Sequence, residues 1–274
     1  MTLQLPAPLW LIGAGKMGCA MAAGWLEDGL DPGLVQVQDP NPSDDAKILF
    51  EKFGVAITPE IKAGSAAPSI VVLAVKPQIM DKVLPALKSM IGADSVLLSI
   101  AAGRTISSLS NFFEPTAAIV RSMPNTPAAI GRGMTVCVAN NHVVETQKDL
   151  CTDLLNAVGE VAWVDDEDEM DAVTALSGSG PAYIFLLAEA MTAAGVEAGL
   201  DEELAIQLAR ATISGAGELL HHSDVDATQL RVNVTSPGGT TAAALNVLMA
   251  EPGMKDLLSR AIKAAAKRSK ELAS

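Results

Sequence analysis

The chain has 274 residues, of which 49% are apolar, 19% charged and only 3% aromatic, and this composition is typical of a globular protein with a sizeable core. Its 32 acidic and 19 basic residues give a formal net charge of −13. Because this charge repels DNA, RNA and anionic bilayers, we expect no nucleic-acid partner and no attraction to a membrane surface.

The N-terminus and the cysteines predict a cytoplasmic protein. The first residues lack the basic flank and small-residue cleavage site of a signal peptide, and no apolar run reaches the roughly 18 residues of a membrane span. Cys19, Cys137 and Cys151 are odd in number and lack CxxC spacing, so they indicate neither a disulfide framework nor a metal site.

Short apolar runs alternate with helical patterns through the first 165 residues. Continuous apolar strands between helices are typical of a parallel sheet covered on both faces. We therefore predict an α/β dinucleotide-binding (Rossmann) domain with a mostly parallel sheet over residues 1–165. In chain order, strands are predicted at Leu9–Ile12, Leu34–Gln38, Ile70–Val75, Val96–Ile100, Ala117–Arg121 and Thr135–Ala139, with helices at Lys16–Leu30 and Asp44–Phe53.

The strand pattern stops at an acidic run over residues 165–169, which indicates a domain boundary. Residues 166–274 are predicted to form an all-α domain. Its helices are rich in Ala and Leu nearly all round, as in Ala205–Ala216, so they need burial on more than one side, which favours a second subunit. The predicted helices are Met170–Gly199, Asp201–His222 with Asp201 as N-cap, Thr240–Glu251 and Met254–Ala273.

A glycine-rich turn joins the first predicted strand to the first predicted helix. In the spacing GxGxxG, the first glycine allows a tight turn, the second lets the backbone approach a pyrophosphate, and the third lets the helix pack on the strand. The helix N-terminus adds unpaired N–H groups and a partial positive charge. This pattern predicts a dinucleotide site at Gly13, Ala14, Gly15, Lys16, Met17 and Gly18.

Asp39 ends the second predicted strand, 21 residues beyond Gly18 (39 − 18). In this fold such a carboxylate accepts hydrogen bonds from the adenine-ribose hydroxyls of NAD and repels a 2′-phosphate. The first cation after it is Lys47, so the sequence favours NADH over NADPH. The alternative is that Asp39 faces solvent as a turn residue, since a Pro-Asn-Pro segment follows it.

Five further motifs resemble those of one enzyme family, the pyrroline-5-carboxylate reductases, which catalyse the last step of proline biosynthesis. The resemblance runs from Leu9 to the last predicted helix. The motifs are Ala74-Val75-Lys76-Pro77-Gln78, Ser99-Ile100-Ala101-Ala102-Gly103, Arg121-Ser122-Met123-Pro124-Asn125-Thr126-Pro127, Ser177-Gly178-Ser179-Gly180-Pro181-Ala182-Tyr183 and Ser236-Pro237-Gly238-Gly239-Thr240-Thr241.

The resemblance implies reduction of 1-pyrroline-5-carboxylate to L-proline by NADPH or NADH, and a helical domain that forms a homodimer, commonly assembled into a decamer. By motif matching, the cofactor site comprises Gly13–Gly18, Asp39, Ala74, Val75, Lys76, Pro77, Ala101, Ala102, Gly103 and Asn233. The implied substrate site comprises Ser236, Gly238, Gly239, Thr240 and Thr241, with Thr241 near the ring nitrogen, and Glu167, around which the match is loose.

The residues themselves suit reduction of an imine. The turn before Thr240 opens a helix, so its N–H groups can hold a carboxylate, and we expect Thr241 to donate a hydrogen bond to the nitrogen. Without the other motifs this turn would be read as a simple helix start. Hydroxyacid dehydrogenases of similar layout need a base, typically a lysine, whereas Tyr183–Leu200 contains no Lys, Arg or His.

Several alternatives stay open at this stage. Members that use NADPH have Ser, Thr or Asn at the position of Asp39, so we expect this chain to work at least as well with NADH. The chain could instead act on another cyclic imine or a hydroxy acid, or be a dinucleotide-binding regulatory protein without turnover. We expect Met123–Pro127 to line the nicotinamide end of the site, while Ser177–Gly180 could serve packing alone. Arg231 could bind the substrate carboxylate or form a surface ion pair.

Overall fold

The computed structural model describes residues 3–60 and 66–273, which form two compact units. The first unit runs to Gly178 and includes the C-terminal segment from Ala266, and the second is Ser179–Ala265. The predicted boundary between residues 165 and 166 stays a prediction. Within the described residues, no helix combines the length and apolarity needed to cross a bilayer.

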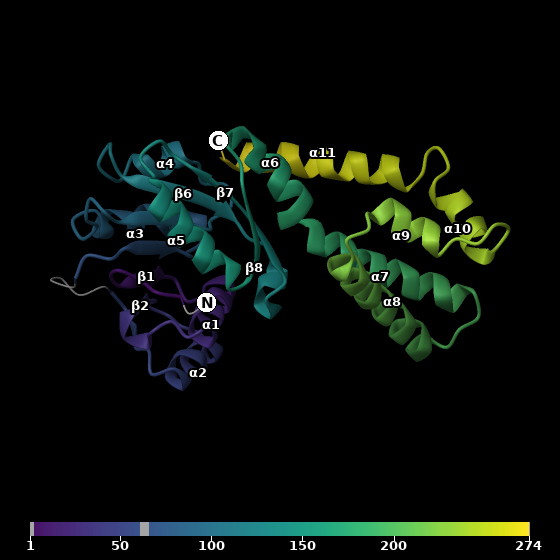
Figure 1. Ribbon diagram of the computed structural model, residues 1–274, viewed down its shortest axis with the longest axis horizontal. Coiled ribbons are helices and arrows are strands. Elements are labelled where there is room, and N and C mark those ends of the chain that lie inside the picture. Colours follow the sequence, from purple (N-terminus) through teal and green to yellow (C-terminus); the bar gives the residue numbers. More distant parts are fainter. Residues whose placement is uncertain (1–2, 61–65, 274) are drawn as a thin grey trace. The chain divides into compact units, whose positions relative to one another are not determined.

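The first unit is built on an eight-stranded sheet (Figure 1). Neighbouring strands follow the order β3-β2-β1-β4-β5-β6-β7-β8, and only the β6–β7 pair is antiparallel. The predicted, mostly parallel sheet is thus confirmed. The strands are β1 Leu9–Ile12, β2 Val35–Gln38, β3 Ile57–Thr58, β4 Ile70–Leu73, β5 Val96–Ser99, β6 Ala118–Met123, β7 Gly133–Ala139 and β8 Gly159–Trp163.

Alternate residues of β1 explain why this strand is apolar throughout. Leu9 and Leu11 belong to one core cluster, with Trp25 of a helix on that face, whereas Trp10 and Ile12 belong to a second cluster on the opposite face. All four strand residues are buried, because helices cover both faces of the sheet. The helices are α1 Lys16–Glu27, α2 Asp44–Lys52, α3 Pro77–Leu87, α4 Ile106–Ser110, α5 Glu145–Asn156 and α6 Met170–Val173.

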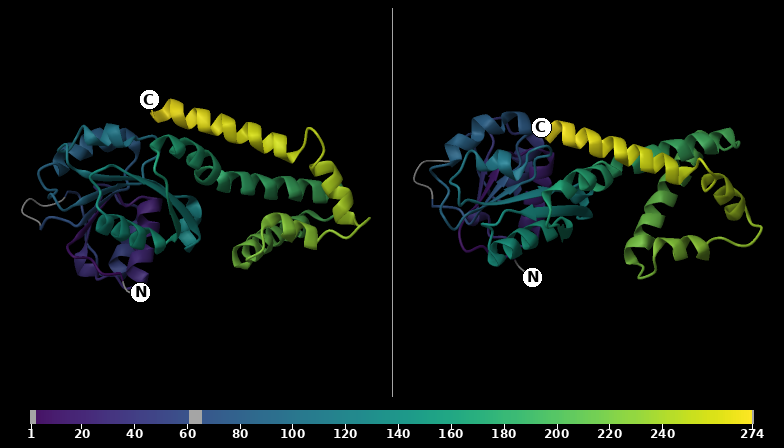
Figure 2. Two further views of the ribbon diagram at one scale, coloured as in Figure 1. Left: turned by 45° about the horizontal axis from the view of Figure 1, so that its top comes forward. Right: turned by 90° about the horizontal axis from the view of Figure 1, so that it is seen from above.

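The second unit contains no strand among its described residues. Its helices are α7 Gly180–Glu197, α8 Glu202–His222, α9 Ala227–Asn233, α10 Thr240–Leu248 and α11 Met254–Ala273, whose last turns belong to the first unit. Figure 2 shows α11 as one continuous helix. The predicted N-cap is confirmed, since Asp201 accepts hydrogen bonds from the backbone N–H groups of Glu203 and Leu204.

The segment Met170–Gly199, which was predicted as helical, is not one continuous helix. The chain forms α6, then a π-helical segment at Thr174–Gly178, and only then α7. Pro181 stands in the first turn of α7, where its missing N–H costs nothing, so a new helix begins there and the earlier one does not continue through it.

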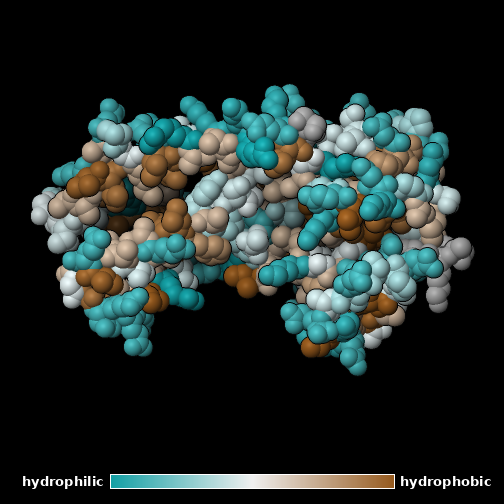
Figure 3. Space-filling model, turned by 180° about the vertical axis from the view of Figure 1, so that it is seen from behind, coloured by the Kyte–Doolittle hydropathy of each residue, from teal (hydrophilic) through white to brown (hydrophobic). Residues whose placement is uncertain are grey.

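Large apolar side chains are exposed on the helical unit. Ile184, Phe185 and Leu186 of α7 are 47%, 63% and 63% exposed, and α7 contains no buried residue. A groove of about 1020 Å³ lies between α7 and α8. Figure 3 shows apolar side chains gathered in patches on the molecular surface. A monomer rarely exposes contiguous patches of this kind, so this surface suits burial against another subunit.

Candidate active site

Three loops meet at one edge of the sheet, each following the carboxyl end of a parallel strand. They come after β1, β4 and β5, which are neighbours in the sheet. Backbone hydrogen bonds join the ends of these strands, from Ala74 N to Ile12 O (2.8 Å) and from Ile100 N to Leu73 O (3.2 Å). The structure therefore brings together the predicted residues Gly13–Gly18, Ala74–Pro77 and Ala101–Gly103, at the edge where open α/β sheets bind ligands.

The glycines of the first loop have three different surroundings. Gly13 has φ +103°, and a Cβ there would lie 2.8 Å from the carbonyl oxygen of Ala74. A Cβ on Gly18 would collide with the carbonyl oxygen of Gly13, so only glycine allows α1 to pack against the loop. A Cβ on Gly15 would meet no atom within 4 Å. Space is therefore open directly above the N-terminus of α1.

The start of α1 suits an anionic group. Gly15 is its N-cap, no side chain caps the helix, and its first turn carries no acidic residue. The partial positive charge and the N–H groups of such a helix end attract phosphate. A pyrophosphate thus fits the open space above Gly15, and this is the fit expected for a dinucleotide.

Asp39 follows β2 and lies against the same loop. Its Oδ2 accepts a hydrogen bond from the backbone N–H of Ala14 (2.8 Å), and its Oδ1 accepts one from the N–H of Asn41 (2.8 Å). The carboxylate is thus fixed at the glycine loop, but each oxygen keeps a second lone pair for a ribose hydroxyl.

The surroundings of Asp39 are negatively charged. The pKa of the Cys19 thiol is raised by burial and, to a smaller extent, by the charges of Asp39 and Asp45. Lys47, the first cation after Asp39, forms an ion pair with Asp44 at 2.8 Å. This region therefore offers little positive charge to a 2′-phosphate.

The predicted substrate turn lies in the second unit. Gly238 has φ +70°, which favours glycine, and the N–H of Gly239 donates to the carbonyl oxygen of Ser236 (3.0 Å). α10 then begins at Thr240 with Gly239 as N-cap and without a side-chain cap. The turn therefore presents N–H groups and the hydroxyls of Thr240 and Thr241 to a small anion.

Two residues near this turn make local contacts. Asn233 ends α9, and its Oδ1 accepts a hydrogen bond from the Gln229 side chain (2.8 Å). Nη1 of Arg231 lies 3.1 Å from the sulfur of Met249. This contact is neither the carboxylate contact nor the surface ion pair that the sequence allowed.

Residues 167–272 match the family model described as pyrroline-5-carboxylate reductase dimerisation, and residues 9–103 match the one described as NADP oxidoreductase, coenzyme F420-dependent. The chain is 41% identical to the pyrroline-5-carboxylate reductase of Pseudomonas aeruginosa over 262 residues, which cover 96% of this chain and 95% of that protein.

Two solved structures are also similar over nearly the full length. One is a pyrroline-5-carboxylate reductase from Coxiella burnetii, with a TM-score of 0.91, 37% identity, and coverage of 98% of this chain and 99% of that one. The other, from Plasmodium falciparum with NADP bound, has a TM-score of 0.82, 32% identity, and coverage of 99% and 100%.

The chain belongs to the pyrroline-5-carboxylate reductase family. The predicted family is confirmed. The predicted fold, a nucleotide-binding sheet followed by a helical dimerisation segment, is confirmed as well. The roles of individual site residues stay predictions.

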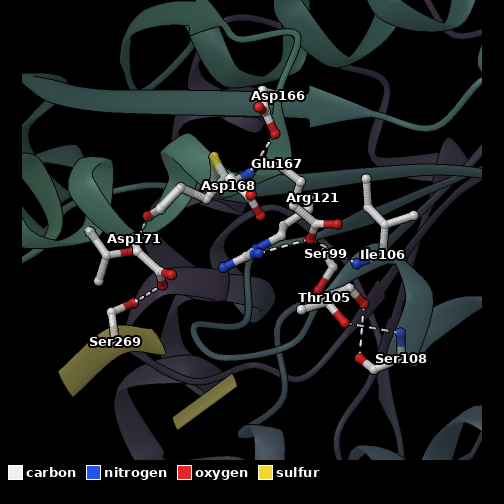
Figure 4. A network of polar contacts seen from close by, with 12 residues as sticks. Ser99, Thr105, Ile106, Ser108, Arg121, Asp166, Glu167, Asp168, Asp171 and Ser269 are labelled. Carbon is white, nitrogen blue, oxygen red and sulfur yellow. Dashed lines mark hydrogen bonds and ion pairs between the residues drawn. The ribbon is translucent and has the colours of Figure 1, made fainter. Parts of the chain in front are cut away.

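Figure 4 shows an ion pair to which the family comparisons assign no role. Nη1 of Arg121, in β6, lies 2.8 Å from Oε1 of Glu167, and the Arg121 side chain is 6% exposed. Sequence analysis missed this pair, although a charge inside the apolar run of β6 was a signal that could have found Arg121. In the structure Glu167 contacts Arg121 and the backbone of Ile106, whereas the family resemblance implied contact with substrate.

The predicted loop Met123–Pro127 is also held by protein contacts. Oδ1 of Asn125 accepts from the N–H of Met134 (2.9 Å), and its Nδ2 donates to Ser177. A Cβ on Gly178 would collide with the end of the Met123 side chain. The Met123 side chain therefore packs directly against Gly178, and the expected nicotinamide contact of the loop stays a prediction.

Proposed function

We propose that the chain transfers hydride from a nicotinamide cofactor to the C=N bond of 1-pyrroline-5-carboxylate, giving L-proline. Pyrroline-5-carboxylate reductase activity is that of its family, so the chain is an NAD(P)H-dependent oxidoreductase. The finer statements, on residues, cofactor preference and assembly, are proposals.

The open space above Gly15 is the observation that best supports the cofactor site. The start of α1 would hold the pyrophosphate through Gly13–Gly18, and Asp39 would accept the adenine-ribose hydroxyls. The loops Ala74–Pro77 and Ala101–Gly103 would carry the nicotinamide half, because they follow β4 and β5, on the far side of β1 from β2. Asn233 would complete the site from the helical domain.

The start of α10 is proposed as the substrate site. Its uncapped N–H groups at Thr240 and Thr241 would bind the carboxylate, with Ser236, Gly238 and Gly239 shaping the turn. Thr241 would donate a hydrogen bond at the ring nitrogen, which must be protonated as the carbon accepts hydride. The bound cofactor supplies the hydride, and the chain supplies orientation and exclusion of water.

No strong base is needed in this reaction, and none is offered by α7. Among its residues only Tyr183, Glu189 and Glu197 can ionise. An alcohol substrate would require removal of a proton, so the alternative of a hydroxyacid dehydrogenase fits this helix less well.

NADH is proposed as a cofactor used at least as well as NADPH. The carboxylate of Asp39 and the negative surroundings of Cys19 would both disfavour a 2′-phosphate. The Plasmodium falciparum relative was solved with NADP bound, so its preference can differ from the one proposed here.

The exposed apolar faces of α7 and α8 support a homodimer through residues 167–272. A decamer of ten chains, built from five such dimers, is proposed as the larger assembly. We also propose that the protein acts in the cytoplasm, where its free cysteines, Cys19, Cys137 and Cys151, stay reduced.

A direct assay tests the activity. Loss of NADH absorbance is followed after addition of 1-pyrroline-5-carboxylate, with piperideine-carboxylate and pyruvate as alternative substrates. Turnover confined to 1-pyrroline-5-carboxylate is expected. Faster turnover of another compound would favour the related reductases, and turnover of none would favour a binding protein without catalysis.

A further inference from the structure

Arg121 places a positive charge inside the first unit. It lies in the middle of β6, opposite Ser99, the last residue of β5, and the residue is only 5% exposed. Its Nη1 donates to Oε1 of Glu167 at 2.8 Å. Because a buried guanidinium is costly without a counter-charge, Glu167 is held firmly at this place.

Glu167 connects this ion pair to the loop that follows β5. Its Oε1 also accepts a hydrogen bond from the backbone N–H of Ile106 (2.9 Å), the first residue of α4 (Figure 4). The first N–H groups of a helix have no partner within the helix, so this carboxylate satisfies one of them. The chain therefore cannot shift at Ile106 without disturbing the pair with Arg121.

The end of α11 lies beside the same loop. Gly103 has φ +74°, and a Cβ there would lie 3.3 Å from the carbonyl oxygen of Leu272, near the end of α11. Nearby, the hydroxyl of Ser269, which is 7% exposed, donates to Oδ1 of Asp171 at 2.6 Å. The last turns of α11 are thus bonded to α6 and lie beside the loop.

Both contacts come from the ends of one segment. The match to the dimerisation family model spans residues 167–272, so its first residue is Glu167 and its last is Leu272. Glu167 accepts a hydrogen bond from Ile106, and Leu272 lies beside Gly103. The start of the matched segment therefore bonds to this loop, and its end lies beside the same loop.

We propose that Arg121 and Glu167 are positioning residues, which hold the Ala101–Gly103 loop in the shape that receives the nicotinamide half of the cofactor. This inference rests on the proposed function. A dinucleotide that begins at Asp39 and crosses the glycine loop reaches β4 and β5 with its other end, given the strand order β2-β1-β4-β5. Glu167 would then act on the nicotinamide end and leave the adenine end unaffected.

Binding without substrate tests this proposal. The dissociation constants of NADH and ADP are measured by calorimetry for the full-length wild type, Glu167→Ala, Glu167→Gln and Arg121→Met. ADP carries the adenine, ribose and diphosphate but no nicotinamide. Glu114→Gln is the matched control, because it removes the charge from an exposed ion pair with Lys88 in the same unit.

The expected result is a selective loss. Glu167→Ala and Arg121→Met should weaken NADH about tenfold and ADP less than twofold, and should raise the KM for NADH while the KM for 1-pyrroline-5-carboxylate stays within twofold. Glu167→Gln should lie between, since its amide oxygen can still accept from Ile106. Glu114→Gln should match the wild type.

Other results would overturn the proposal. Unchanged NADH affinity with a raised KM for 1-pyrroline-5-carboxylate would assign Glu167 to substrate binding, as the family resemblance implied. Equal losses for NADH and ADP would show general damage to the fold. If Glu167→Ala does not fold, Glu167→Gln decides between these results. A wild type that binds neither nucleotide would instead contradict the proposed function.

Discussion

Replacing Asp39 with asparagine should shift cofactor use toward NADPH. The substitution removes the negative charge but keeps the size of the side chain and an oxygen that can accept from the N–H of Ala14, as Oδ2 does at 2.8 Å. The glycine loop should therefore keep its shape. What changes is the charge that faces the 2′-position of the adenine ribose.

The size of the effect follows from Coulomb's law. Two unit charges about 4 Å apart repel by about 1 kcal/mol in bulk water and by about 4 kcal/mol at an effective dielectric constant of 20. Asp39 is half-buried, so its repulsion of a 2′-phosphate should lie between these limits. Since about 1.4 kcal/mol is a factor of ten, the ratio of kcat/KM for NADPH to that for NADH should rise by about fivefold or more.

Steady-state kinetics with both cofactors at saturating 1-pyrroline-5-carboxylate measure this ratio. Asp94→Asn serves as the control, because Asp94 is an exposed carboxylate just before β5, at the opposite edge of the sheet. The reasoning is refuted if Asp39→Asn leaves the ratio unchanged, or if the wild type itself favours NADPH tenfold or more.

Three further outcomes are expected. Gly15→Ala should weaken NADH binding at least tenfold but leave the melting temperature unchanged, because its methyl group enters the open space proposed for the pyrophosphate. Gly18→Ala should instead lower the melting temperature by several degrees, because its methyl group collides with Gly13. Equal melting temperatures of the two variants would contradict this. Thr241→Ala should lower kcat/KM for 1-pyrroline-5-carboxylate about tenfold, in keeping with about 1 kcal/mol for one hydrogen bond. Thr241→Ser should lower it much less, because serine keeps the hydroxyl. An unchanged value for Thr241→Ala would remove Thr241 from the mechanism. Burial raises the pKa of the Cys151 thiol to about 12, so the stability it contributes is complete below its ordinary value near 9 and is lost as the pH rises above it. Urea unfolding of the wild type should therefore lose about 1.4 kcal/mol more per pH unit above 9 than Cys151→Ala does, and parallel losses would refute the assignment.

Local signals in the sequence predicted much of the fold. The apolar run at Leu9–Ile12 and the last helix at Met254–Ala273 have the predicted bounds. β3 was missed because its two residues are too short to show a pattern, and β8 because its residues are mostly half-exposed. The antiparallel pairing of β7 depends on the short connection after β6, which is too brief for a crossover, and no strand pattern encodes it.

The candidate site divides in the same way. The glycine motif placed the loop after β1, and the spacing to Asp39 anticipated a carboxylate near it, because motif and strand order are local properties. The contacts of Glu167 join residues 46 and 61 positions apart in the chain, so they depend on how helices pack on the sheet. Only the tertiary structure could show that Arg121, Glu167 and Ile106 meet.

The central claim is that hydride passes from the bound nicotinamide directly to the imine carbon of the substrate. The most direct measurement uses NADH deuterated at both positions of nicotinamide C4, with 1-pyrroline-5-carboxylate in ordinary water and mass spectrometry of the product. The account predicts L-proline with one deuterium. This deuterium should be on C5, the carbon next to the ring nitrogen that bears no carboxylate. One deuterium should remain on C4 of the oxidised cofactor. Proline without deuterium would contradict the account.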